Sequence, residues 1–341
     1  MIKRKGTMFE RYLTTDTLDQ TCAIFGNFDL NIQTIESEFN VRIYNSDSES
    51  AGGSKITVRG EDEQKVTNAY YAVAYLKRLS SFGNEITTQS VDYAVSMVKS
   101  GNAAALEDFG SDCICVTTTG KPVKAKTVGQ KAYVEAIKKN TVVIGIGPAG
   151  TGKTFLAVAM ATAALRNKEV NRIILTRPAV EAGEKLGFLP GDLQNKIDPY
   201  LRPLHDALRE MLGPDGYARC VEKGVIEIAP LAYMRGRTLD DSFIILDEAQ
   251  NTTGEQMKMF LTRLGFRSKA VVTGDITQID LPRGQKSGLK EAVKILDVID
   301  DIAIHRFSEK DVVRHRLVQK IILAYDKYEN KHREDATRTK K

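Results

Sequence analysis

The chain has 341 residues, a formal net charge of +5, and 42% hydrophobic residues. This composition is typical of a globular protein of about two domains, and no apolar run is long enough to cross a bilayer. The four cysteines lack the spacing of a zinc site. We therefore expect a cytoplasmic protein with no membrane partner, whose mild positive charge permits contact with nucleic acid without requiring it.

Residues 1–115 carry no nucleotide motif, and their mixed patterns predict a small α+β domain. The predicted elements are a strand at 21–25, a helix at 30–38, a hairpin of 41–44 with 54–59, helices at 62–78 and 86–99, and a loop at 101–112. Lysines are frequent in the following stretch, 116–126, which we interpret as a basic linker and the domain boundary.

From residue 127 to 328, apolar strands alternate with helical patterns, as in a parallel α/β sheet. The predicted strands are 142–146, 172–176, 225–229, 243–246, 270–273 and 302–305, with helices after Lys153, Thr253, Ser287 and Ser308. A long insertion, 181–224, separates the second and third strands. The charged residues 329–341 are expected to form a tail.

The most specific motif follows the first of these strands and fills every fixed position of the phosphate-loop pattern G-x-x-x-x-G-K-S/T. It consists of Gly147, Pro148, Ala149, Gly150, Thr151, Gly152, Lys153 and Thr154. Its glycines let backbone N–H groups point at a polyphosphate, and the next helix adds the positive end of its dipole. Lys153 is expected to reach the β- and γ-phosphates, and Thr154 to hold Mg²⁺.

Two acids follow the predicted strand 243–246, about ninety residues after the phosphate loop. Asp247 is expected to hold Mg²⁺, and Glu248 to polarise the attacking water as general base. An isolated acid pair at a strand end is weak evidence, but after a complete phosphate loop it favours hydrolysis of the bound nucleotide over its storage.

Three further side chains are candidates, each with a simpler alternative. Gln278 follows the strand 270–273. It is a candidate to contact the γ-phosphate or the lytic water, and the alternative is that it belongs to an ordinary turn. Arg177 ends the strand 172–176 and either lies beside the phosphate-loop strand or is solvated. Arg314 is either an arginine finger or a surface residue. An arginine finger is a cation that stabilises charge on the transferring phosphate.

The run Asn195–Asp198 spells the guanine-reading pattern N-K-x-D. That pattern must follow a buried strand, but here it follows Gly191–Gln194, which has no strand pattern. We interpret the match as coincidence, which leaves ATP as the expected nucleotide.

In this order, the motifs resemble those of the PhoH-like ATPase family over residues 128–328. The supporting runs are 130–133, 147–154, 176–180, 187–192, 199–203, 246–251, 274–278 and 311–315. The resemblance implies a RecA-like P-loop NTPase core related to the single core lobe of superfamily-one helicases. It also implies that Gln130 faces the adenine, that Gln278 senses the γ-phosphate, and that Arg314 is a finger.

Residues 1–115 resemble the KH-like domain of the longer members of this family. A KH domain clamps nucleic-acid backbone with a G-x-x-G loop. The corresponding residues, Gly26–Asp29, place an acid at the second glycine. The helix that contains residues 31–36 is equally consistent with docking a protein.

The resemblance implies a Mg²⁺-dependent ATPase coupled to RNA, as a helicase or remodeller in ribosomal RNA maturation. The alternative is an ATP-dependent switch that docks an RNA-processing protein, such as an endonuclease, without unwinding. A small-molecule kinase is disfavoured because Glu248 is placed to activate water. Since residues 127–328 have room for one core lobe, we expect a homo-oligomer, for example a hexameric ring, with Arg314 acting on the neighbouring subunit.

Overall fold

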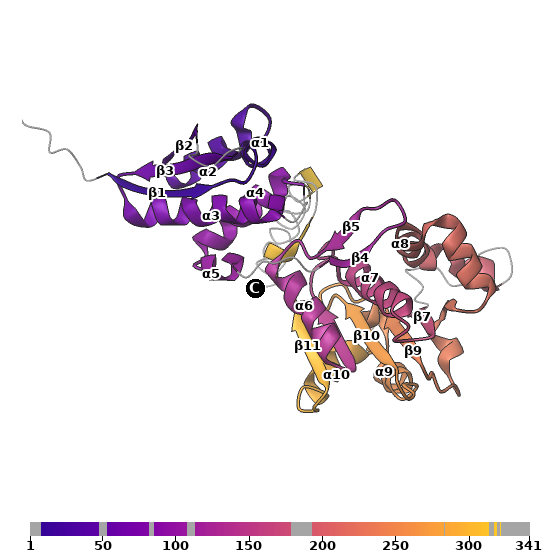
Figure 1. Ribbon diagram of the computed structural model, residues 1–341. Coiled ribbons are helices and arrows are strands. Elements are labelled where there is room, and N and C mark those ends of the chain that lie inside the picture. Colours follow the sequence, from indigo (N-terminus) through magenta and orange to yellow (C-terminus); the bar gives the residue numbers. More distant parts are fainter. Residues whose placement is uncertain are drawn as a thin grey trace, which may run out of the picture. The chain divides into compact units, whose positions relative to one another are not determined.

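The computed structural model describes residues 8–47, 53–81, 85–107, 113–178, 193–282, 284–313, 317, 318 and 321. These residues belong to two compact units (Figure 1). The first comprises the described residues up to 107 and those from Val313 on, and the second comprises the described residues from 113 to Val312. The first unit carries no nucleotide motif, and the second contains the phosphate loop. No helix in the described ranges is both long and apolar enough to cross a membrane.

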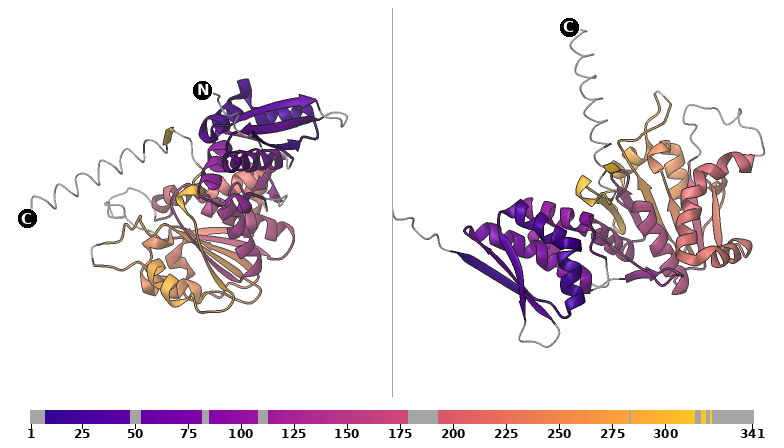
Figure 2. Two further views of the ribbon diagram at one scale, coloured as in Figure 1. Left: turned by 90° about the vertical axis from the view of Figure 1, so that its left-hand side faces the viewer. Right: turned by 90° about the horizontal axis from the view of Figure 1, so that it is seen from above.

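The first unit is built on a three-stranded antiparallel sheet of order β1-β3-β2. The strands are β1 (Phe9–Thr14), β2 (Arg42–Asp47) and β3 (Ser54–Gly60). The helices are α1 (Leu18–Phe25), α2 (Leu30–Phe39), α3 (Glu63–Ser81), α4 (Thr88–Lys99) and α5 (Ala103–Glu107). The helices lie on one side of the sheet, as the right view of Figure 2 shows. The predicted hairpin and the predicted helices at 30–38, 62–78 and 86–99 are confirmed.

The strand predicted at 21–25 is wrong, because these residues belong to α1. Thr17 caps this helix by accepting a hydrogen bond from the backbone N–H of Gln20. Gln20, Thr21 and Ile24 are buried at helical spacing, so the apolar run covers one helix face. The sequence analysis also missed β1 and the short α5, which lies within the predicted loop 101–112.

The basic linker predicted at 116–126 is also wrong. Strands β4 (Cys113–Val116) and β5 (Pro122–Lys124) pair antiparallel here. Cys115 and Val123 are buried in a hydrophobic cluster of the second unit. Lys121 and Lys126 are exposed while Val123 between them is buried in this cluster, so the stretch belongs to the second unit.

The second unit contains a six-stranded parallel sheet of order β11-β6-β10-β9-β7-β8. Its strands are β6 (Val142–Ile146), β7 (Arg172–Arg177), β8 (Ile226–Pro230), β9 (Ser242–Leu246), β10 (Lys269–Gly274) and β11 (Ile302–Arg306). All six predicted strands are present, within one residue at their ends. The parallel α/β fold predicted for this part of the chain is confirmed.

Two hydrophobic clusters cover the two faces of this sheet. Alternation along β6 places Val143 in one cluster and Ile144 in the other. The first cluster includes residues of α6 (Val128–Lys139), α7 (Lys153–Arg166) and α8 (Leu193–Glu222, interrupted at Gly213), and the second includes residues of α9 (Gly254–Leu261) and α10 (Gly288–Ile295). The run Asn195–Asp198 lies within α8, and residues 179–192 before this helix lie outside the described residues.

Two predictions concern residues at the edges of the described ranges. After Ser308 the structure has a single turn of 3₁₀ helix, Glu309–Asp311, in place of the start of the predicted helix. Arg314 and the tail 329–341 lie outside the described residues.

Candidate nucleotide-binding site

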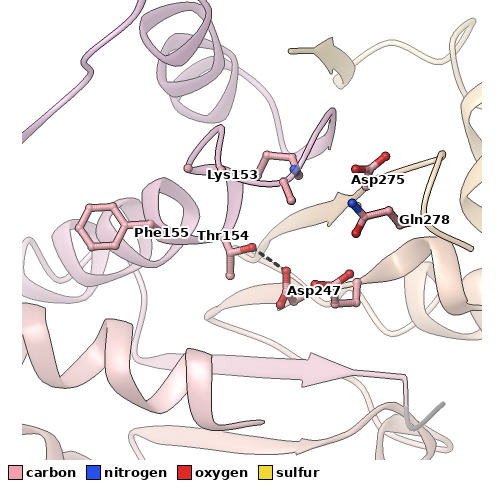
Figure 3. A pocket seen from close by; sticks show the side chains of 11 residues that line it. Lys153, Thr154, Phe155, Asp247, Asp275 and Gln278 are labelled. Carbon is pink, nitrogen blue, oxygen red and sulfur yellow. Dashed lines mark hydrogen bonds between the residues drawn. The ribbon is translucent and has the colours of Figure 1, made fainter. Parts of the chain in front are cut away.

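The carboxyl ends of β6, β10 and β9, which are neighbours in the sheet, meet at a cleft of about 260 Å³ (Figure 3). In Figure 3, Lys153 lies on one side, Asp275 and Gln278 lie on the other, and Phe155 points away. The lining residues are Ala149, Gly150, Gly152, Lys153, Thr154, Phe155, Asp247, Glu248, Gly274, Asp275 and Gln278. The parallel topology therefore gathers three segments that are distant in sequence.

The phosphate loop joins β6 to α7 with a backbone that requires glycine at several positions. Gly150 and Gly152 have φ values of 89° and 79°, which disfavour other residues. A Cβ atom on Gly147 would lie 2.6 Å from the Cβ of Phe307. Because the first N–H groups of a helix have no intrahelical acceptor, the start of α7 offers donors to an anion.

Lys153 lies at the start of α7, and its side chain folds back across the loop. Its ammonium donates hydrogen bonds to the carbonyl oxygens of Gly147 at 2.7 Å and Pro148 at 2.8 Å. Lys153 is only 8% exposed. The ammonium therefore lies within the loop, and a polyphosphate bound there would compete with these two carbonyls for it.

Asp247 is buried at the end of β9 and connects three elements. Its Oδ1 accepts hydrogen bonds from Thr154 Oγ1 at 2.6 Å and Thr273 Oγ1 at 2.7 Å. The two residues predicted to hold Mg²⁺, Thr154 and Asp247, are thus in contact (Figure 3). A hydroxyl and a carboxylate are hard oxygen ligands, which fit a Mg²⁺ ion that retains waters and phosphate oxygens.

Glu248 follows in the left-handed backbone conformation, with φ 53° and ψ 38°. For a residue with a side chain, this conformation costs on the order of 1–3 kcal/mol. Two donors hold its carboxylate: Arg177 at 2.8 Å on Oε1 and Gln250 Nε2 at 2.6 Å on Oε2. The side chain of Glu248 is still 40% exposed, so water can reach the carboxylate.

The sequence analysis missed Gln250, which connects Glu248 to the loop after β10. Gln250 is 1% exposed; its Nε2 donates to Glu248, and its Oε1 accepts from the backbone N–H of Asp275 at 3.0 Å. Its place two residues after Glu248 is visible in the sequence, but the direction of its side chain is not. Gln250 is a positioning residue, because it holds the carboxylate of Glu248 and does not line the cleft.

Asp275 was also missed. Its Oδ1 accepts hydrogen bonds from the N–H and the hydroxyl of Thr277, while its buried Oδ2 has no hydrogen-bond partner among the described residues. Gln278 is exposed and lines the same side of the cleft, with its backbone N–H bonded to the carbonyl of Asp275. Contact between Gln278 and a γ-phosphate stays a prediction.

The position expected for Arg177 needs correction. Its strand, β7, does not neighbour the phosphate-loop strand, because β9 and β10 lie between β7 and β6. Arg177 instead lies beside the end of β9, where it also pairs with Asp247 at 3.2 Å. The 17% exposed guanidinium neutralises two neighbouring carboxylates. A direct contact with nucleotide stays a prediction.

Gln130 is 4% exposed, and both ends of its amide are engaged. Its Oε1 accepts from the backbone N–H of Lys126 at 2.7 Å, and its Nε2 donates to the carbonyl of Thr151 at 3.0 Å. In this conformation Gln130 supports the phosphate loop, and its contact with adenine stays a prediction.

Aromatic side chains pack beneath the loop. His305 lies between Tyr133 and Phe307, with ring centroids 5.5 Å and 4.5 Å away. Burial lowers the pKa of His305 below its usual 6.5, although the carboxylate of Asp311 and a backbone hydrogen bond with Gly129 oppose this. His305 therefore packs against Tyr133 and Phe307 as a neutral ring at neutral pH.

Comparison with known proteins identifies the second unit. A family model described as PhoH-like protein matches residues 122–326. A PhoH-like protein of Bacillus subtilis is 53% identical over 309 residues, which are 91% of this chain and 95% of the relative. One from Mycobacterium tuberculosis is 53% identical over 312 residues, 91% of this chain and 86% of the relative. Among solved structures, the SWI2/SNF2 ATPase core of Sulfolobus solfataricus in complex with dsDNA aligns with 45% of this chain and 32% of that chain's length. The sequence identity is 16% and the TM-score is 0.30, which is too low for inference.

Proposed function

The chain belongs to the PhoH-like protein family, and we propose that it is a Mg²⁺-dependent ATPase whose turnover is coupled to RNA. The observation that carries the proposal is the set of contacts at one end of the parallel sheet. Thr154 and Asp247 are hydrogen bonded beside the phosphate loop, and Glu248 is held next to them by two donors. A protein that only stores nucleotide has no need of a carboxylate held this way.

Each residue of the site has a separate role in the proposed hydrolysis. The loop N–H groups and Lys153 would bind the β- and γ-phosphates, and Thr154 and Asp247 would hold Mg²⁺, which when bound would neutralise charge on those phosphates. The Oε atoms of Glu248 orient the attacking water and accept its proton. Arg177 and Gln250 keep that carboxylate in place, and Gln278 lies where a terminal phosphate or the water would contact it.

Coupling to RNA is supported by the family resemblance and by the first unit. Its chain order, β1-α1-α2-β2-β3-α3, has a short turn at Gly26–Asp29 between α1 and α2, at the position of the backbone-clamping loop of a KH-like domain. Because Asp29 stands at the second glycine, the support comes from the chain order and not from the turn itself. We propose that the unit is KH-like and that ATP turnover drives RNA unwinding or remodelling during ribosomal RNA maturation in the cytoplasm.

The site is also expected to be incomplete within one chain. The second unit has one parallel sheet and therefore one core lobe among the described residues, whereas in related two-lobe motors a second lobe closes over the nucleotide. A homo-oligomer, such as a hexameric ring, would supply Arg314 from the neighbouring subunit. A sedimentation experiment that finds a monomer with full ATPase activity contradicts this part of the proposal.

A second candidate function is an ATP-dependent switch that docks an RNA-processing protein such as an endonuclease. It is favoured by the turn at Gly26–Asp29, where the loop lacks its second glycine and exposes 91% of Phe28. An exposed aromatic ring beside an acid is better suited to a protein pocket than to a phosphate backbone.

An ATPase assay with and without a panel of RNAs and single-stranded DNA separates the two functions. An RNA-coupled motor shows turnover that RNA increases, and RNA binding that weakens steeply with salt. A switch shows slow turnover that RNA does not change, together with affinity for its protein partner that depends on ATP. Absence of phosphate release under all conditions would contradict the ATPase itself.

A further inference from the structure

The outer face of the first unit's sheet, opposite its helices, presents three rows of side chains. The register of β1, β3 and β2 places Tyr12, Thr57 and Tyr44 in one row. The flanking rows are Glu10, Arg59 and Arg42 on one side, and Thr14, Lys55 and Ser46 on the other. We refer to these nine residues as the outer sheet face.

Two tyrosines at the centre of this face are open to solvent. Tyr12 is 61% exposed and Tyr44 is 42% exposed, although aromatic residues of a sheet are usually covered. Thr57 is buried between them, on the central strand. The rings are two strand spacings apart, about 10 Å, so each can accept its own planar ligand group.

Cations surround these rings. The ammonium of Lys55 lies 4.0 Å from the centroid of the Tyr12 ring. Arg42 and Arg59 occupy the next row, where Glu10 pairs with Arg59 at 3.2 Å. The outer sheet face therefore carries three basic residues against one acid. A hollow at the same end is lined by Met8, Glu36, Arg42, Ile43, Tyr44 and Arg59, so one further acid, Glu36, lies beside the two arginines.

The other candidate surface of this unit has the opposite charge. Residues 16–40, which include α1, the turn and α2, contain five acids and no lysine, arginine or histidine. The acids are Asp16, Asp19, Asp29, Glu36 and Glu38. Glu36 lines the hollow beside Arg42 and Arg59, and Glu38 pairs with Lys99, so Asp16, Asp19 and Asp29 provide the negative charge around α1 and the turn. Phosphates are repelled there, so a polyanion favours the outer sheet face over the turn at Gly26–Asp29.

We propose that the outer sheet face binds single-stranded RNA, with bases stacked on Tyr12 and Tyr44 and the backbone contacted by Lys55, Arg42 and Arg59. Aromatic rings flanked by cations are the combination that single-stranded nucleic acids require. A base that stacks on Tyr12 displaces the ammonium of Lys55, whose flexible stem then reaches a neighbouring phosphate. The inference rests on the proposed RNA coupling and adds to it the surface that contacts RNA.

Fluorescence anisotropy of a labelled 12-nucleotide polyuridine RNA with the full chain tests the proposal. Tyr12→Ala and Tyr44→Ala should each weaken binding roughly 5-fold to 150-fold, the range for loss of one stacked base. Tyr12→Phe keeps the ring and should bind within about 2-fold of wild type. Arg42→Ala should lower the slope of log affinity against log salt by about 0.7.

Phe28→Ala is the matched control, because it removes an exposed aromatic ring from the acidic turn of the same unit. It should leave RNA affinity unchanged, and thermal unfolding should show that every variant is folded. Unchanged RNA affinity in both tyrosine→alanine variants overturns the proposal and leaves the face as a candidate protein surface. Loss of binding in Phe28→Ala alone also overturns it, in favour of the turn.

The nucleic acid itself is tested with polythymidine DNA of the same length. Binding to DNA that is more than tenfold tighter than to RNA contradicts RNA as the ligand. If the wild-type chain hydrolyses ATP but binds no RNA, the proposed RNA coupling fails as well. If it binds RNA and the tyrosine variants bind equally well, only the outer sheet face is refuted.

Discussion

Gln250→Leu tests whether the buried amide positions the general base. Leucine keeps the volume but removes the donor to Glu248 Oε2 and the acceptor for the N–H of Asp275. A buried N–H without a partner costs about 1–3 kcal/mol, so the unfolding midpoint should fall by about 2–12 °C. Glu248 is 40% exposed and can recover hydration, so most of the loss of stability arises at Asp275.

The effect on turnover should be larger than the effect on binding. Arg177 still holds Oε1 of Glu248, so the carboxylate is misplaced but not lost. We expect kcat to fall about 10- to 100-fold, as for a small displacement of a reacting group. KM for ATP should change little, because Gln250 does not line the cleft.

The assay is steady-state phosphate release at saturating ATP, alongside thermal unfolding. Gln250→Glu is the informative companion, because its carboxylate still accepts from Asp275 but repels Glu248. Because it also places a charge at a position that is only 1% exposed, it should lose at least as much stability as the leucine variant, and as much kcat. A folded Gln250→Leu protein with wild-type kcat would refute the positioning role.

Three further predictions concern the phosphate loop and the stability of the second unit. Lys153→Ala should abolish detectable hydrolysis and weaken ATP binding, because the ammonium for the β- and γ-phosphates is gone; calorimetry with ATP checks this, and wild-type affinity contradicts it. Burial lowers the pKa of His305 in the folded protein. As pH falls below 6.5, this histidine is therefore protonated more readily in the unfolded chain than in the folded one, and the folded protein loses stability. The decrease in melting temperature between pH 7 and pH 5.5 should therefore be smaller in His305→Gln than in wild type. An equal decrease in both proteins would contradict the lowered pKa of His305. The ammonium of Lys269 donates hydrogen bonds to two carbonyls at the end of α6. The acceptors are Ile137 and Asn140, the latter at 2.6 Å. Lys269→Met should lower the free energy of unfolding by about 1–3 kcal/mol in a denaturant titration, whereas the exposed Lys258→Met should not.

Much of the second unit could be predicted from sequence because its four central strands, β6, β7, β9 and β10, are buried on both faces. Such strands are continuous apolar runs, which are easily distinguished from the helices between them. The phosphate loop and the acids Asp247 and Glu248 then follow strand ends, and parallel topology brings those ends together. The contact between Thr154 and Asp247 is the physical result.

The contacts that could not be predicted from the sequence depend on side-chain direction and on the order of the strands in the sheet. The pairing of Arg177 with Asp247 and Glu248 requires β7 to neighbour β9, which no local pattern encodes. Gln250 became visible only through its two hydrogen bonds. In the first unit, residues 21–25 were apolar enough for a strand, but the Thr17 cap and burial of one face make them helical.

The central claim is that Glu248 activates water in an ATP-hydrolysing site, and Glu248→Gln tests it most directly. The amide retains the shape of the side chain but cannot accept a proton from water. Measured by ATP binding and single-turnover phosphate release, the variant should keep wild-type affinity while its hydrolysis slows about 10²- to 10⁴-fold. The exposed Glu255→Gln, on α9, is the matched control and should hydrolyse normally. A Glu248→Gln protein that turns over ATP at the wild-type rate would contradict the account.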